Sequence, residues 1–378
     1  MKEEPFVYGK TALFSNFTDR EKEQKELAQN FTSLTNTIIV SPRRWGKSSL
    51  VETVAGKIMR ENKKFKICLI DTFNVKSESE FYEQLAKGII RATSNKWQEK
   101  LSTAKKFLSQ LLPQVSFSPD NISEISFGVD WKELSKKPDD ILNLAQNIAQ
   151  EKKIKIVVCI DEFQSIGEFE NTVAFQRKLR SHWQRHHDVC YCLYGSKRHM
   201  LLDIFSNVEM PFYRFGDIMF LEKISNKNWG KFIVKRFADT NKKITIEQAE
   251  YLANRVENHS YYVQQLAQQS WLRTKTSCNI SIIDDALENI KNQLDLLFVG
   301  QIETFTAAQI NFLGAVIDGE TAFTSQENLS KYRMGTSANV LKIKQTLTSR
   351  EIIDIRGNTV EILDPIFKLW LKENYFKR

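Results

Sequence analysis

The sequence predicts a mostly parallel α/β domain, followed by an all-α lid domain and a C-terminal winged helix-turn-helix domain. Buried strand patterns alternate with helical patterns along the first part of the chain, as in a parallel sheet covered on both faces. Strand patterns then stop, and only helical periodicity continues. The last part reads as three short helices and a β-hairpin. We therefore expect domains at residues 1–222, 223–297 and 298–378.

The strands expected in the first domain are short β-branched and aliphatic runs. The run Lys-Ile-Val-Val-Cys-Ile at 155–160 is apolar after its first residue, as expected for a strand buried on both faces. Helical patterns fill the gaps between these runs. The expected strands are Thr37–Val40, Lys66–Asp71, Lys155–Ile160, Val189–Tyr194 and Asp217–Leu221, and the expected helices are Lys47–Arg60, Ser79–Ala92, Asp139–Glu151 and Thr172–His187.

One stretch, at about residues 97–138, breaks the alternation of strands and helices. Gln98–Leu112 has a helical pattern. Ser116–Phe117 and Ile125–Val129 read as two extended pieces around the turn Pro119-Asp120-Asn121. We interpret this stretch as an insertion, a helix and a hairpin that project from the sheet domain.

The rest of the chain divides into a helical segment and a segment that ends in a hairpin. Val340, Ile343 and Leu347 recur at helical spacing in the last tail helix and should face the core. The hairpin turn Arg356-Gly357-Asn358 is the candidate wing. The expected lid helices are Asn228–Ala238, Ile246–Val256, Tyr261–Arg273 and Ile282–Gln293, and the expected winged-helix elements are helices Thr306–Asp318, Ser325–Tyr332 and Ser337–Ser349 and strands Ile352–Ile355 and Thr359–Leu363.

The composition is that of a globular protein with an excess of basic residues. Hydrophobic residues make up 42% of the 378 residues, charged residues make up 26%, and the formal net charge is +8. That charge permits a nucleic-acid partner, although many basic proteins bind none. The sequence contains no apolar run of ~18 residues that would span a membrane, and no secretion signal. Its five cysteines lack metal-ligand spacing and fit a reducing compartment, so we expect a cytoplasmic protein.

The strongest chemical signal is the segment Ser41-Pro42-Arg43-Arg44-Trp45-Gly46-Lys47-Ser48-Ser49, between an expected strand and an expected helix. Such a loop points backbone N–H groups at a phosphate, and the helix dipole adds attraction. Gly46 permits close approach of the backbone, Lys47 reaches the β- and γ-phosphates, and Ser48 supplies a hydroxyl to Mg²⁺. We therefore expect this segment to bind ATP with magnesium as a P-loop.

Ser41 stands where this pattern usually begins with glycine. Serine is the smallest replacement that bears a side chain, so we expect the turn to survive, with an effect on affinity or turnover. Arg43 and Arg44 either raise the positive potential at the phosphates or point away and pair with carboxylates. Trp45 either packs beside the nucleotide or only anchors the loop. The alternative to a P-loop is a chance Gly-Lys-Ser before a helix.

A second signal follows the buried strand at 155–160. Asp161 and Glu162 come directly after it, so the strand delivers two carboxylates to the carboxyl edge of the sheet, where ligands bind in such folds. Asp161 would hold magnesium, directly or through water, and Glu162 would orient and activate the attacking water. The pair is a candidate Walker B motif, and the alternative is a solvated acidic loop.

Further motifs occur along the chain, and together with the P-loop they resemble archaeal-type P-loop ATPases of the STAND/AAA+ group, relatives of the origin-recognition ATPases. The resemblance covers nearly the whole chain apart from the insertion, and it implies an AAA+/STAND-like sheet domain, a helical lid and a winged helix. The matching segments are Phe17-Thr18-Asp19-Arg20-Glu21-Lys22-Glu23, Ile160-Asp161-Glu162-Phe163-Gln164, Leu193-Tyr194-Gly195-Ser196, Tyr213-Arg214-Phe215, His259-Ser260-Tyr261-Tyr262 and Leu363-Asp364-Pro365-Ile366-Phe367-Lys368-Leu369-Trp370-Leu371.

The resemblance implies roles for single residues outside the P-loop. Phe17 and Arg20 lie in the segment that the family places near the adenine, with an ordinary charged helix start as the alternative. Ser196 resembles a sensor of the γ-phosphate, or else it forms a simple strand-end turn. Arg214 resembles a trans-acting arginine finger, or else it forms a salt bridge. His259 stands where the family often has a His-Pro pair, here without the proline, and either contacts the nucleotide or is structural.

Whether the tail binds DNA is left open by its charges. The candidate recognition helix would expose polar and basic side chains that suit phosphate contacts. A dense basic stripe is missing, however, and the winged helix could instead pack on the nucleotide domain and hold it closed. The basic helix Gln176–His187 is a second candidate surface, or else a solvated face. The residues expected to face DNA from the tail are Asn339, Lys342, Lys344 and Gln345, with Lys331, Arg333 and Arg356 beside them.

These motifs lead us to expect an ATP-binding, Mg²⁺-dependent ATPase with slow, regulated turnover, which acts as a conformational switch for an unknown partner. Lys47 and magnesium would neutralise charge while water attacks the γ-phosphate, with Glu162 as the base. One alternative is a nucleotide-regulated DNA-binding regulator, and another is a protein that binds ATP without turnover. Self-association, hinted at by Arg214, and a protein partner stay open, and the preference for ATP over GTP comes from the resemblance.

Overall fold

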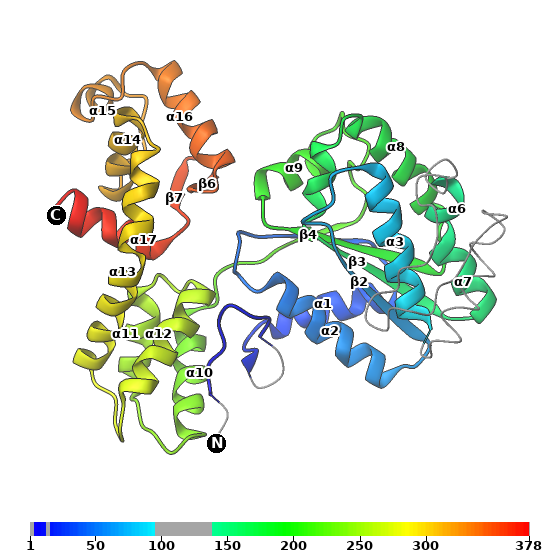
Figure 1. The fold of residues 1–378 in the computed structure, drawn as a ribbon, viewed down its shortest axis with the longest axis horizontal. Helices are drawn as coiled ribbons and strands as arrows, with labels where there is room; N and C mark the ends of the chain where they lie inside the picture. Colours follow the sequence, from blue (N-terminus) through cyan, green and yellow to red (C-terminus); the bar gives the residue numbers. More distant parts are fainter. Residues whose placement is uncertain (1–3, 13–15, 95–137, 378) are drawn as a thin grey trace, which may run out of the picture. The chain divides into compact units, whose positions relative to one another are not determined.

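The computed structural model describes residues 4–12, 16–94 and 138–377 of the chain. The helix and hairpin expected of the insertion therefore lie outside the described residues. The structure divides the chain into two compact units (Figure 1), and each is described by itself.

The first unit comprises Arg20–Glu222, and the second comprises Met1–Asp19 together with Lys223–Arg378. The first nineteen residues, expected within a domain at 1–222, thus group with the C-terminal part of the chain.

The first unit is built on the expected parallel sheet. The strands are β1 (Thr37–Val40), β2 (Phe65–Asp71), β3 (Lys155–Asp161), β4 (Val189–Gly195) and β5 (Asp217–Phe220). Their order is β2-β3-β4-β1-β5, and every neighbouring pair is parallel. β3 and β4 are almost wholly buried, which explains their continuous apolar sequence. Because the strands are parallel, their carboxyl ends meet at one edge of the sheet.

Helices cover both faces of this sheet. Figure 1 shows α1 and α2 below the strands and α8 and α9 above them. Phe81, Phe163 and Trp183 belong to a hydrophobic core between the sheet and the helices of the upper face. The helices of the unit are α1 (Glu21–Thr32), α2 (Lys47–Glu61), α3 (Glu78–Thr93), α6 (Pro138–Leu142), α7 (Leu144–Lys152), α8 (Thr172–Trp183) and α9 (Arg198–Ser206), with a 3₁₀ helix at Phe163–Glu168.

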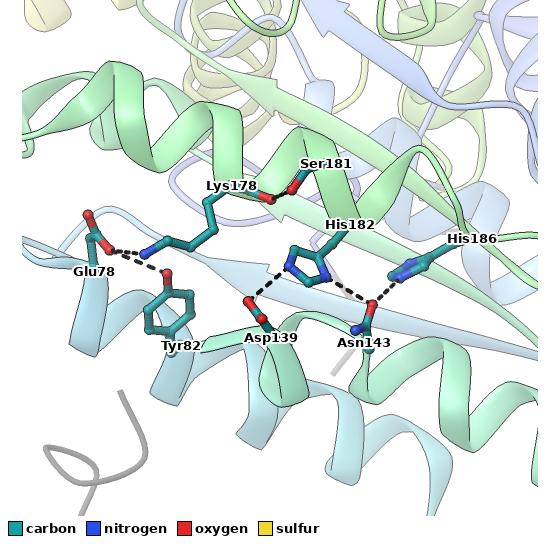
Figure 2. A network of polar contacts seen from close by, with 8 residues as sticks. All are labelled: Glu78, Tyr82, Asp139, Asn143, Lys178, Ser181, His182 and His186. Carbon is teal, nitrogen blue, oxygen red and sulfur yellow. Dashed lines mark hydrogen bonds and ion pairs between the residues drawn. The ribbon is translucent and has the colours of Figure 1, made fainter. Parts of the chain in front are cut away.

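The helix expected at Asp139–Glu151 is interrupted at Asn143, between α6 and α7. Figure 2 shows that the Asn143 side chain is turned toward α8. Its Oδ1 accepts hydrogen bonds from His182 Nδ1 at 3.1 Å and from His186 Nε2 at 3.2 Å. These contacts, from α8 and from the segment that follows it, could not be predicted from local periodicity.

The helix expected at Thr172–His187 ends earlier, at Trp183. The Trp183 ring stacks on Tyr191 of β4, with 4.0 Å between ring centroids. After Trp183 the chain continues in turns, in which the Arg185 and His186 N–H groups donate to the His182 and Trp183 carbonyls, before β4 begins at Val189.

The second unit contains the lid helices and the winged-helix elements. The lid helices are α10 (Asn226–Ala238), α11 (Ile246–Arg255), α12 (Ser260–Arg273) and α13 (Ile280–Glu303). The tail has α14 (Ala307–Ile317), α15 (Gln326–Lys331), α16 (Ser337–Ser349), β6 (Ile353–Arg356), β7 (Thr359–Ile362) and α17 (Pro365–Trp370), followed by a π-helical turn at Leu371–Tyr375. Side-chain caps from Thr245, Thr306 and Thr336 mark the starts of α11, α14 and α16.

One continuous hydrophobic core joins the lid and the winged helix. α13 runs through the boundary expected at 297/298, and its residue Phe298 packs against Phe367 of α17, with 5.2 Å between ring centroids. The N-terminal segment belongs to the same core, because Phe6 is 1% exposed and contacts Phe232 and Phe237 of α10.

In the described residues, no helix has both the length and the apolar character needed to cross a membrane.

Candidate functional site

The P-loop segment leaves β1 and enters α2, as the sequence predicts. Arg44 and Gly46 have left-handed backbone conformations, with φ of 64° and 95°. Glycine suits position 46, because a residue with a side chain would be strained at this φ. Ser41 is 1% exposed and is not among the residues with positive φ, so its conformation does not require the usual glycine.

Lys47 is covered by its own loop and is 6% exposed. Its Nζ donates hydrogen bonds to the carbonyl oxygens of Ser41 at 3.2 Å and Pro42 at 3.0 Å. Backbone carbonyls are weaker partners for an ammonium group than phosphate oxygens, because the phosphate carries negative charge. A phosphate bound in this loop would therefore be a better partner for Lys47 Nζ than the two carbonyls.

Ser48 and Asp161 meet between the start of α2 and the end of β3. Ser48 Oγ donates to Asp161 Oδ2 at 2.7 Å, and the Glu162 backbone N–H donates to Asp161 Oδ1 at 2.8 Å. Thr72 fixes the same strand end, because its N–H and Oγ1 both donate to the Asp161 carbonyl. Burial raises the pKa of Asp161 to about 6, against the lowering effect of the Ser48 hydrogen bond. A bound cation would favour the charged form.

Glu162 follows in a left-handed conformation with φ of 52°. Its Oε2 accepts three hydrogen bonds: from the Ser196 N–H at 3.3 Å, from Ser196 Oγ at 3.0 Å and from Gln164 Nε2 at 2.5 Å. Ser196 follows β4, which pairs with β3, so the sheet itself brings the two residues together. The structure thus places the expected base against the expected sensor.

Gln164 and Thr72 contact this site but were not singled out from the sequence. Gln164 lies two residues after Glu162 in the same Asp-Glu-Phe-Gln motif, and Thr72 directly follows β2, at the same edge of the sheet. These two positions in the sequence would have been enough to identify both residues as candidates. Gly195 makes room for Gln164, because a Cβ at Gly195 would lie 1.8 Å from Gln164 Oε1.

The oxygen ligands available at the carboxyl edge of the sheet suit a magnesium ion. In the described residues, no group of three or more His, Cys, Asp or Glu could hold a metal by itself. Magnesium bound with a nucleotide needs only one or two protein ligands, since phosphate oxygens and waters complete its octahedron. The Ser48 hydroxyl and the Asp161 carboxylate, 2.7 Å apart, are two suitable hard ligands.

The remaining loop residues differ in burial. Trp45 is 3% exposed, which fits an anchoring role, and Ser49 is also buried. Arg43 and Arg44 are exposed. Arg20 is 3% exposed, and its Nη2 donates to the Trp45 carbonyl at 3.3 Å.

Arg214 lies away from this edge of the sheet. It sits in an exposed turn just before β5, with φ of 51°. β5 begins at Asp217, in register with Thr37 at the amino end of β1, whereas the P-loop follows the carboxyl end of β1. The two are therefore separated by the length of a strand. The contribution expected of Arg214 from a neighbouring subunit stays a prediction.

Phe17 and His259 belong to the second unit. Phe17 is half-buried. His259 is 5% exposed at the start of α12, and its ring centroid lies 5.1 Å from that of Tyr262. Their contacts with the nucleotide stay predictions.

Known proteins share this fold at low sequence identity. The Walker-type ATPase of Pyrococcus abyssi is similar with a TM-score of 0.69 and 17% identity, over 97% of this chain and 99% of that chain. Aeropyrum pernix ORC2, in ADPNP and ADP complexes, is similar with a TM-score of 0.59 and 13% identity, over 96% and 93%. Aeropyrum pernix ORC1, in complex with DNA, is similar with a TM-score of 0.50 and 11% identity, over 95% and 94%.

In sequence, residues 297–373 match a family model described as a probable winged helix domain. No curated protein matches the chain. The chain therefore has the P-loop ATPase fold of the archaeal Walker-type and ORC structures, with a winged helix domain at residues 297–373.

Proposed function

We propose that the protein binds ATP with Mg²⁺, hydrolyses it slowly, and uses the nucleotide to switch the lid and winged helix for a partner not yet known. The observation that carries this proposal is the 2.7 Å hydrogen bond from Ser48 to Asp161, directly beside the Glu162 carboxylate. The P-loop hydroxyl and the two carboxylates to which we assign the magnesium ion and the general base thus lie together at one edge of the sheet, where such sheets bind ligands.

Each residue has a role in attack of water on the γ-phosphate. Lys47 would leave the Ser41 and Pro42 carbonyls and contact the β- and γ-phosphates. Ser48 and Asp161 would hold the magnesium ion, which neutralises charge on the phosphates when bound. Loop N–H groups before α2 would cradle the phosphates.

Glu162 would accept the proton of the attacking water. Donors from Ser196 and Gln164 fix its Oε2, while its Oε1 has no donor among the described residues. Oε1 is therefore the oxygen that we assign to proton transfer.

Contacts within the second unit support the switch. Tyr262 of α12 donates to Asp364, the N-cap of α17, and Lys368 of α17 pairs with Glu257 in the turn before α12. The lid and winged helix are thus tied to each other, so a movement of the lid would carry the winged helix with it. His259 lies in this turn, and its predicted contact with the nucleotide would start the movement.

The charges of the tail favour this switch over a DNA-binding regulator. Lys331 pairs with Glu320 at 2.8 Å, and Arg356 pairs with Asp354 at 3.1 Å. Lys344 lies over the Phe323 ring, 4.7 Å from its centroid. Of the basic residues expected to face DNA, Lys331 and Arg356 are therefore paired with carboxylates, which weakens their attraction for phosphates, while Lys344 is held against a ring and keeps its charge.

The five cysteines are buried and free, which supports a protein of a reducing compartment, and we place it in the cytoplasm.

The test is ATP binding and hydrolysis by the purified full chain, with and without Mg²⁺ and with GTP as competitor. Lys47→Ala and Glu162→Gln serve as matched variants, and duplex DNA is added in a parallel arm. We expect Lys47→Ala to lose affinity and turnover, and Glu162→Gln to keep affinity and lose turnover.

Stimulation of turnover by DNA would favour the regulator. Tight binding without turnover in the wild type would identify a nucleotide-gated scaffold. Absence of nucleotide binding would overturn the proposal.

A further inference from the structure

Arg20 is an unusual residue at the beginning of α1. It is 3% exposed, and its φ of 70° is left-handed, as is the φ of 59° at Asp19. Left-handed backbone costs free energy at a residue with a side chain, so it persists where surrounding contacts hold it. A buried guanidinium also needs partners for its charge and its donors.

The partners of Arg20 lie on α1 and on the P-loop. Nη1 pairs with Glu23 Oε1 at 3.0 Å, which holds the guanidinium against the first turn of α1. Nη2 donates to the Trp45 carbonyl at 3.3 Å. Trp45 directly precedes Gly46 and is 3% exposed, so the contact from Arg20 reaches a buried residue of the loop.

A hydrogen bond to the Trp45 carbonyl also orients the next N–H. The peptide that joins Trp45 and Gly46 is planar and trans, so its C=O and N–H point in opposite directions. Fixing the carbonyl toward Arg20 therefore fixes the Gly46 N–H away from Arg20. The loop residues before α2 supply the N–H groups of the phosphate site, and Gly46 is its last residue before Lys47.

We propose that Arg20 is a positioning residue for the P-loop: its guanidinium locks the Trp45–Gly46 peptide so that the Gly46 N–H is aimed at the phosphates before nucleotide binds. This inference rests on the proposed ATP site and adds a residue to it. The nearness to adenine expected of the segment that contains Arg20 stays a prediction beside it. A donor that is already oriented strengthens binding, because no conformational entropy is lost to orient it when the nucleotide binds.

The experiment compares Arg20→Met and Arg20→Lys with Arg91→Met, a control at an exposed arginine of α3 in the same unit. One readout is the Kd of a fluorescent ATP analogue with Mg²⁺. The second is amide hydrogen exchange of peptides covering residues 42–48 in nucleotide-free protein. We expect Arg20→Met to weaken binding about tenfold, the typical loss for a hydrogen bond to a charged group, and to speed exchange in the loop.

Arg20→Lys should fall between Arg20→Met and the wild type, since it keeps the charge without the planar fork. Arg91→Met should match the wild type in both readouts.

Unchanged loop exchange in both Arg20 variants would overturn the inference, even if α1 became less stable. Faster loop exchange with unchanged Kd would also overturn it, since the peptide would then not matter for the phosphates. The exchange readout needs no nucleotide. If the wild type binds no ATP, the proposed function fails on its own, and the exchange data still decide whether Arg20 orders the loop.

Discussion

The Ser48 hydroxyl donates a 2.7 Å hydrogen bond to the Asp161 carboxylate and so joins the first turn of α2 to the end of β3. Burial raises the pKa of Asp161 to about 6, so its negative charge is costly in the free protein. A magnesium ion between the phosphates and this pair would relieve that cost. In the proposed site, binding of a cation would therefore be favoured by the relief of this cost at Asp161.

We predict that Asp161→Asn removes most of the gain in ATP affinity that Mg²⁺ provides. The loss should be about tenfold or more, as for a lost contact to a charged group. The measurement is calorimetric titration with ATP, with and without Mg²⁺. The matched control is Asp71→Asn, at the residue in register with Asp161 on β2. An equal Mg²⁺ effect in Asp161→Asn and the wild type would show that Asp161 does not hold the ion.

A second prediction concerns the donors on Glu162. Gln164→Leu removes the amide that donates to Glu162 Oε2 and keeps a similar volume. We expect kcat for ATP to fall on the order of tenfold with Kd unchanged, because a loosened carboxylate is less often placed to take the proton. Single-turnover hydrolysis and equilibrium binding separate the two constants.

Gly195→Ala provides an independent test of the same contact. Its methyl group would meet Gln164 Oε1 at 1.8 Å, so the glutamine must move away. We expect the same loss of kcat. A rise of kcat in both variants would mean that the donors restrain Glu162 rather than position it.

The sheet and the phosphate loop could be predicted from the sequence because local pattern determines them. β1 lies at the residues expected, Thr37–Val40, and the other strands differ by a residue or so at one end. Val340, Ile343 and Leu347 are buried, as their spacing predicts. The strand signal is a run of apolar and β-branched residues, and the helix signal is the spacing of apolar residues by three and four positions.

The contacts that were missed depend on residues far apart in sequence. The bond from Arg20 to Trp45 joins α1 to the P-loop, and no local pattern reveals a guanidinium bound to a carbonyl. The hydrogen bonds from His182 and His186 to Asn143 likewise join residues about forty positions apart in the sequence. Lys344 was expected to be exposed, but it lies over Phe323. The periodicity of a helix shows which of its faces is apolar. It does not show that a long side chain such as that of Lys344 folds against a nearby apolar ring.

A third prediction concerns pH, through His186. Burial lowers its pKa to about 4 from 6.5, and His182 and His187 add repulsion. Its Nε2 donates to Asn143, and its Nδ1 accepts from Tyr191 (Figure 2 shows the Asn143 contact). The folded protein thus holds His186 neutral, while the unfolded chain gains a proton below about pH 6.5.

The sign follows from that difference in protons. Above about pH 6.5 His186 is neutral in both states and does not reduce the free energy of unfolding. As pH falls toward 4, the unfolded chain binds a proton at His186 that the folded protein does not, and the free energy of unfolding falls by on the order of 2–3 kcal/mol. Urea unfolding at several pH values should show a smaller acid loss in His186→Gln than in the wild type. His199→Gln, at an exposed histidine of α9 that is not among the groups that shift the pKa of His186, is the control and should behave as the wild type. Parallel pH curves for His186→Gln and the wild type would contradict the prediction.

A fourth prediction concerns the winged helix and DNA. Arg333 and Lys342 are exposed beside or on α16, whereas Lys331, Lys344 and Arg356 contact other parts of the protein. Lys331 and Arg356 are paired with carboxylates, whereas no ion pair among the described residues involves Arg333, Lys342 or Lys344, so we expect about three phosphate contacts and a slope of log K for duplex DNA against log salt near −3. Fluorescence anisotropy at several salt concentrations measures it. A slope steeper than about −6 would restore the DNA-binding regulator.

The fifth prediction tests whether the lid and winged helix move as one body. Tyr262 of α12 donates to Asp364 Oδ2 at 2.6 Å, while Asp364 Oδ1 accepts the first N–H groups of α17. Tyr262→Phe removes the only atom that makes this bond and keeps the ring in the core. We expect amide exchange in α17 to rise about tenfold, because a hydrogen bond to a carboxylate contributes ~1.5 kcal/mol or more.

Tyr251→Phe is the matched control for this variant. Its hydroxyl also donates to an aspartate, Asp284 at 2.9 Å, but that bond joins α11 to α13 and not to the winged helix. Exchange in α17 should therefore stay at the wild-type rate in the control. If ATP changes exchange in α17 of the wild type and of Tyr251→Phe, but not of Tyr262→Phe, the hydroxyl carries the signal from lid to winged helix. Equal ATP responses in all three proteins would place the coupling in the shared apolar core, around Phe298 and Phe367.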